Sequence, residues 1–145
     1  MLDISRIGVY DYVYNLLYDV VTTNVYSMNE PQELTQSDVN DGFVVIRVGE
    51  LNDASEFTAN AYGWARVYID AYVPPISRGR LDFEKYKAFE DAINQVIEQA
   101  TQDASGTYYI QDGSVLSMDN NAESNANNAY FMFVKSFVVM IDKEN

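Results

Sequence analysis

The sequence contains neither cysteine nor histidine among its 145 residues. Without cysteine the chain has no disulfide bonds, no thiolate metal ligands and no cysteine nucleophile. Without histidine it lacks the commonest general base and the commonest zinc ligand. The signature motifs of nucleotide-binding proteins, serine hydrolases and metalloproteases are absent as well. We therefore expect no catalysis, no cofactor and no metal site.

Basic residues are also scarce, with 9 lysines and arginines against 22 acidic residues and a formal net charge of −13. This charge repels the phosphates of nucleic acids and anionic lipid surfaces. No uncharged apolar run reaches the roughly 18 residues of a membrane span, and the N-terminal segment lacks the pattern of a signal peptide. We expect neither sequence-specific nucleic-acid binding nor membrane binding. The charge is equally consistent with a role limited to solubility.

The length fits one domain, which we assign to residues 1–145. Two helices are predicted from apolar residues spaced three and four apart. The first covers residues 4–22, with Asp3 as its N-cap, and the second covers residues 82–102, with Asp82 as its N-cap.

Strands are predicted where apolar residues are consecutive or alternate. Residues 43–48 are nearly all apolar and β-branched, which indicates a central strand. Residues 57–73 alternate between small apolar and aromatic or polar side chains, which predicts a long strand with helices on its apolar face and a bulge or bend at Gly63. Residues 107–110 and 115–118 flank a hairpin turn or a bulge, and residues 129–141 form a long last strand.

Polar stretches at residues 23–42 and 119–128 predict two long loops. The expected order of elements is therefore α-β-β-α-β-β. The fold class is α+β, with two helices packed on one face of a mainly antiparallel sheet of four strands or slightly more.

One face of the long strand supplies the main candidate site. Its side chains are expected about 7 Å apart, and their types match the composition of interface hot spots. Three roles fit this row: a layer packed inside the domain, a protein interface, or a platform for stacking sugars or bases. An enzymatic alternative would use Arg66 and Asp70 as a polar pair in a pocket. The row consists of Tyr62, Trp64, Arg66, Tyr68, Asp70 and Tyr72.

Two smaller clusters complete the set of candidates. Arg78 and Arg80 lie near Lys85 and Lys87 and form the one basic cluster, which would anchor an acidic neighbour such as an identical chain or simply be a solvated helix start. The acidic loop residues Asp112, Asp119 and Glu123 do not follow the EF-hand pattern of calcium ligands, so a solvated loop is expected there.

The overall layout resembles that of the tail-terminator and tail-completion proteins of bacteriophages. The resemblance covers nearly the whole chain, through Val9 to Val21 and residues 43–48, 57–73, 82–102 and 129–141, and it is architectural. It implies a structural protein of the virion, located in the neck or tail, that catalyses nothing. Copies would form a homo-oligomeric ring around a channel through which DNA passes, and would contact other neck or tail proteins.

The surfaces expected to join copies are the strand edges, the two long loops and the aromatic row from Tyr62 to Tyr72, together with Arg78 and Arg80. A different class of function uses the same row. In that alternative the chain is a non-catalytic module that binds sugars or peptides on its tyrosine and tryptophan side chains.

Overall fold

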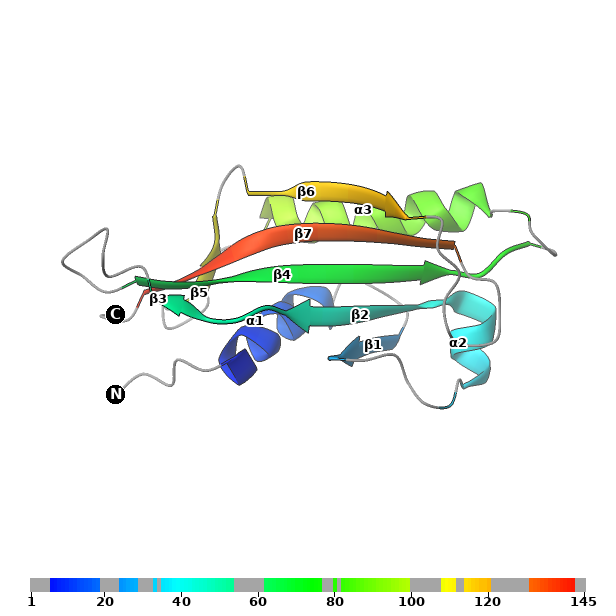
Figure 1. Ribbon diagram of the computed structural model, residues 1–145. Coiled ribbons are helices and arrows are strands. Elements are labelled where there is room, and N and C mark those ends of the chain that lie inside the picture. Colours follow the sequence, from blue (N-terminus) through cyan, green and yellow to red (C-terminus); the bar gives the residue numbers. More distant parts are fainter. Residues whose placement is uncertain are drawn as a thin grey trace.

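The computed structural model describes residues 6–18, 24–28, 33, 35–53, 62–76, 80, 82–99, 108–111, 114–120 and 131–142. Within these residues the protein combines helices with one sheet, as Figure 1 shows, so the α+β class is confirmed. The described elements are α1 (Arg6–Tyr18), β1 (Asn24–Ser27), α2 (Gln36–Asp41), β2 (Phe43–Val48), β3 (Asn52–Asp53), β4 (Tyr62–Val73), α3 (Phe83–Gln99), β5 (Tyr108–Ile110), β6 (Leu116–Asn120) and β7 (Phe131–Asp142).

Two long antiparallel strands, β4 and β7, form the middle of the sheet and are paired along their full 12-residue lengths. On one side, β4 pairs with β2 and β3, and β2 then pairs with β1 in parallel. On the other side, both β5 and β6 pair antiparallel with β7. The long pair runs across the molecule in Figure 1, with the shorter strands on either side.

A bulge interrupts the outer strands beside β4. Residues 49–51, between β2 and β3, lie opposite Ala65 and Arg66, and the Gly49 N–H donates to the Arg66 carbonyl at 2.9 Å. Because β5 and β6 both pair antiparallel with β7, they run in the same direction and the expected hairpin between them is wrong. Asp112 and Gly113, where the bulge alternative was expected, lie outside the described residues. The bulge expected at Gly63 is also wrong, since Gly63 pairs in regular register.

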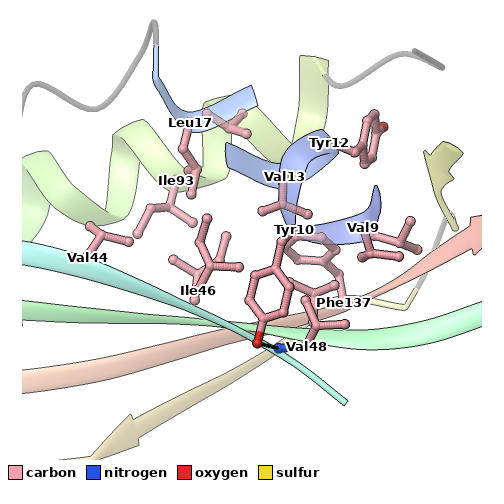
Figure 2. Close-up of a cluster of buried hydrophobic side chains, with 14 of the residues drawn as sticks. Val9, Tyr10, Tyr12, Val13, Leu17, Val44, Ile46, Val48, Ile93 and Phe137 are labelled. Carbon is pink, nitrogen blue, oxygen red and sulfur yellow. Dashed lines mark hydrogen bonds between the residues drawn. The ribbon is translucent and has the colours of Figure 1, made fainter. Parts of the chain in front are cut away.

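The core lies between one face of the sheet and the helices α1 and α3. In Figure 2 both helices lie on the same side of the strands, with Val13, Leu17 and Ile93 directed towards Ile46 and Phe137. The alternation of β4 places its small apolar side chains on this face, as expected from the sequence. They are Ala65, Val67, Ile69, Ala71 and Val73, all of which are fully buried.

The segment expected to be one long loop, residues 23–42, instead contains β1 and α2. The short helix α2 is fixed by a capping box, in which the Thr35 hydroxyl accepts from the Asp38 N–H and the Asp38 carboxylate accepts from the Thr35 N–H. The described part of the chain therefore has a third helix and a parallel edge strand, and its sheet has seven strands rather than about four.

The two predicted helices are both present within the described residues, as α1 and α3. Asp82 caps α3 as expected, because its carboxylate accepts from the Lys85 N–H at 3.1 Å. The predicted cap Asp3, and residues 19–22 of the first predicted helix, lie outside the described residues. Among the helices that are described, none is long and apolar enough to span a membrane.

Gly42 connects α2 to β2 in a backbone conformation that only glycine adopts readily, with φ 84° and ψ −176°. A Cβ atom at this position would lie 2.3 Å from the Tyr72 carbonyl oxygen and 2.9 Å from the ring of Pro74. Glycine at residue 42 is thus required both by conformation and by the close approach of β4.

We expect Gly42→Ala to lower the free energy of unfolding by about 3 kcal/mol, because strained backbone and a steric clash are combined. Gly49→Ala is the matched control, since its Cβ would meet only the Arg66 carbonyl oxygen at an ordinary 3.4 Å. Its effect should stay within about 1 kcal/mol. Urea unfolding of both variants measures the difference, and equal losses would contradict the assignment.

Candidate functional site

The predicted aromatic row lies on the face of β4 that points away from α1 and α3. Its alternation is regular, so Trp64, Arg66, Tyr68, Asp70 and Tyr72 share this face. The backbone of Tyr62 continues the same register, but its side chain lies outside the described part of the chain.

The two arginines of the predicted basic cluster are not shown to contact this row. Arg78 lies outside the described residues, and Arg80 is exposed in the segment before α3. The two lysines have partners within their own chain, because Lys85 donates to the Asn40 carbonyl and Lys87 pairs with Asp91 at 2.7 Å.

The candidate calcium ligands do not form a described site either. Asp112 and Glu123 lie outside the described residues, and the backbone of Asp119 pairs with that of Phe133 within β6 and β7. The described residues contain no group of three or more acidic side chains arranged to hold a metal ion.

Tyr72, at one end of the row, is used for internal packing. It is only 5% exposed and stacks on Phe43 of β2, with ring centroids 4.6 Å apart and an interplanar angle of 13°. Tyr26 of β1 meets Phe43 edge-on at 5.8 Å. Of the three roles considered for the row, packing within the molecule therefore applies to Tyr72.

Asp70, the neighbour of Tyr72 in the row, forms an ion pair with a residue that sequence analysis did not select. Arg47 of β2 donates from Nε and Nη2 to the two carboxylate oxygens of Asp70, at 2.6 Å and 2.9 Å. This hydrogen bonding raises the pKa of Arg47, against the opposing effect of burial. The Arg47 guanidinium also lies 4.7 Å from the ring centroid of Tyr68, a cation–π distance. Asp70 is therefore paired with Arg47, and not with Arg66 as the enzymatic alternative required.

The positive charge of Arg66 has no negatively charged partner within the described residues. Its Nη1 donates to the hydroxyl of Ser136 at 2.8 Å and to the carbonyl of Ser114 at 3.5 Å, both of which are neutral. Within the described part of the chain, no carboxylate lies at ion-pair distance from Arg66. The half-buried guanidinium is thus held in place by two serines and retains donors for a further partner.

These residues belong to a larger surface that we call the aromatic face. Cross-strand pairing sets Trp64 beside Met140, and Tyr68 beside Ser136, which in turn lies beside Leu116. Leu116 is 55% exposed, and the other large side chains are half-buried or exposed. Tryptophan, tyrosine, methionine and arginine are the types enriched where proteins associate. The aromatic face comprises Arg47, Trp64, Arg66, Tyr68, Leu116 and Met140.

A second polar cluster holds α2 against β1. The fully buried carboxylate of Asp38 accepts hydrogen bonds from the Asn24 amide at 2.9 Å and from the Tyr26 hydroxyl at 2.7 Å. Burial alone would raise the pKa of Asp38, but hydrogen bonds from Asn24, the Thr35 amide and Tyr26 outweigh it and lower the pKa. Burial and the bond to Asp38 raise the pKa of Tyr26 to about 12. This cluster joins α2 to β1, and its polar groups make hydrogen bonds to one another.

Arg47 has a carboxylate partner and Arg66 has neutral partners, and this difference can be tested by measuring the stability of variants. Arg47→Met leaves the buried Asp70 carboxylate without its partner, so we expect the free energy of unfolding to fall by about 2–3 kcal/mol. Arg66→Met removes hydrogen bonds to neutral groups only, and should cost about 1 kcal/mol. Urea unfolding at low protein concentration measures both, and a larger loss for Arg66→Met would contradict the assignment.

The Asp38 cluster predicts a dependence of stability on pH at both extremes. The lowered pKa of Asp38 contributes stability above the ordinary value of 3.8, and this is lost as the pH falls below it. The raised pKa of Tyr26 contributes stability that is complete below pH 10.0 and is lost as the pH rises to about 12. The difference in free energy of unfolding between the wild type and Tyr26→Phe should therefore fall as the pH rises from 10.0 to about 12. Urea unfolding across the pH range tests this, and parallel curves for the two proteins would contradict it.

Comparison with known proteins gives no relative from which a function could be transferred. No family model matches the sequence, and no curated protein matches it significantly. The resemblance to phage tail proteins therefore stays a prediction, and function has to be argued from the aromatic face and its charges.

Proposed function

We propose that this chain is a structural protein of a phage neck or tail, which assembles into a homo-oligomeric ring and catalyses no reaction. The observation that supports the proposal is the aromatic face. It carries Trp64, Tyr68 and Leu116 on the side of the sheet opposite α1 and α3. Neither of these two helices is placed to cover it.

The aromatic face covers only part of the sheet. Its members on β4, from Trp64 to Tyr68, extend over about 13 Å at about 3.3 Å per residue, because Asp70 and Tyr72 further along the strand are buried. A compact cluster of hot-spot residue types suits the centre of a subunit contact. Burying this surface against another copy would remove the half-exposed aromatic side chains from water.

The sheet also ends in two edges, β1 on one side and β5 with β6 on the other. An edge strand can pair through its outer backbone groups with a strand of another chain. We propose that these edges assist the aromatic face in joining copies. A ring of strongly acidic subunits would let DNA pass through its channel without adhering, because like charges suppress phosphate contacts. Its other partners would be neighbouring neck or tail proteins.

We expect the purified wild type to form a closed ring of defined mass, measured by light scattering at several concentrations and by electron microscopy. Trp64→Ala should weaken the subunit contact by about 2 kcal/mol, which is roughly 30-fold, because a hot-spot aromatic is removed. Tyr18→Ala is the matched control, since Tyr18 is an aromatic residue on α1 with 65% exposure. It should leave the assembly unchanged.

A wild type that stays monomeric at high concentration would contradict the ring. The sugar- or peptide-binding module is the alternative that the same experiment distinguishes. In that case Trp64→Ala would abolish binding in a screen of oligosaccharides and peptides while leaving the oligomeric state unchanged.

A further inference from the structure

We propose that Arg66 of one copy binds the acidic outer surface of α3 on a second copy. This inference rests on the proposed self-assembly and names the two surfaces that meet. One is the aromatic face. The other, which we call the α3 stripe, consists of Glu84, Asp91 and Glu98.

Arg66 is the cation of the aromatic face that remains available. The other arginine, Arg47, is already neutralised by Asp70 through two hydrogen bonds. Arg66 has only the Ser136 hydroxyl and the Ser114 carbonyl as partners, and these hold its guanidinium in a fixed place. A half-buried charge with neutral partners gains from a carboxylate, which a guanidinium binds through paired N–H groups.

The α3 stripe is a row of three exposed acidic side chains. Seven-residue spacing places Glu84, Asp91 and Glu98 on one side of the helix, about 21 Å from end to end. All three are exposed, while Phe89, Ile93 and Val96 on the opposite side of α3 enter the core. Lys87 pairs with Asp91, and within the described residues no ion pair involves Glu84 or Glu98, so the stripe keeps the negative charges of these two residues.

An apolar side chain stands beside this stripe. Phe83, the first residue of α3, is 75% exposed, the highest value among the described large apolar residues. The aromatic face offers Trp64 and Met140 next to each other across β4 and β7. The two surfaces therefore match in apolar character as well as in charge.

The two surfaces lie on opposite sides of the molecule. α3 packs by its apolar side on one face of the sheet, so the stripe points outward on that side and the aromatic face points outward on the other (Figures 1 and 2). A contact between two different surfaces is heterologous and leaves one of each free on every pair of copies. Repetition of this contact builds a ring where the rotation closes.

The overall charge of −13 does not prevent this contact. At physiological ionic strength the screening length is about 8 Å, so repulsion between distant charges is largely removed. Pairs in direct contact decide the outcome, and here a positive Arg66 would meet a negative stripe. Two variants test the contact, one with a negative charge in place of Arg66 and one with positive charges in the α3 stripe.

The first variant is Arg66→Glu, with a net charge of −15 (−13 − 2), and the second is Glu84→Lys/Glu98→Lys, with a net charge of −9 (−13 + 4). The second variant preserves the Lys87–Asp91 pair. Each alone would place like charges in the contact, so we expect association at least about 10-fold weaker than wild type, equivalent to about 1.4 kcal/mol. An equimolar mixture should associate again, with the two variants alternating. Light scattering and native mass spectrometry measure masses and composition.

Circular dichroism and thermal unfolding establish that both variants are folded, and Arg66→Lys, which keeps the charge, should retain association. The inference is overturned if Arg66→Glu associates like the wild type, or if the folded variants do not associate when mixed. In either case a wild-type ring would survive through other surfaces. A wild type that forms open fibres, lost in Arg66→Glu, would support the contact and contradict the ring. A wild type that forms only closed dimers would contradict the heterologous contact. A monomeric wild type would contradict both.

Discussion

The antiparallel pairing of β4 with β7 is the constraint on which the rest of the structure depends. Every other described strand attaches to this pair, either directly or, for β1, through β2. The pair also separates two environments. On one face its apolar side chains receive α1 and α3, and on the other face it presents Trp64, Arg66 and Tyr68. A shift of the register by one residue would exchange these faces and bury the arginine among the helices, so the apolar core fixes the geometry of the aromatic face.

Polar groups on both sides of the sheet are satisfied in different ways. On the helix side, Lys135 is 6% exposed, lies 3.7 Å from a carboxylate oxygen of Glu90 on α3, and donates to the hydroxyl of Ser117. On the other side, Asp70 is buried and bound by Arg47. Arg66 differs from both, since no carboxylate of the described chain reaches it. Arg66 is thus the arginine of this face whose described partners are all neutral, whereas Arg47 has a carboxylate partner.

The sequence predicted the elements whose pattern is long and periodic. Strict alternation in residues 62–73 identified β4 and both of its faces, and the apolar spacing around Phe89, Ile93 and Val96 identified α3 with its cap at Asp82. It did not identify α2 and β1, because each is too short to show a period. The signal that was present is local, since Thr35 and Asp38 have the spacing of a capping box.

The candidate site was predicted in part, because alternation along a strand is itself a periodic pattern. Membership of one face follows from alternation alone, and this placed Trp64, Arg66 and Tyr68 together. Pairing between strands does not follow from alternation, so neither the burial of Tyr72 on Phe43 nor the bond between Arg47 and Asp70 was predicted. Arg47 gave one hint, as the charged residue of an otherwise apolar strand. The charge left on Arg66 became visible only when the partners of the other cations were known.

The position of β7 in the sheet has a consequence for synthesis of the protein. The central pair joins residues 62–73 to residues 131–142, with α3, β5 and β6 between them in the chain. Such a contact is strongly non-local, and it forms only after the intervening chain has closed a long loop. On the ribosome, β7 must emerge before the edge of β4 that lies opposite β2 is covered. Nascent chains therefore expose the backbone N–H and C=O groups of this edge until late in translation, and rapid pairing with β7 limits the association of incomplete chains through it.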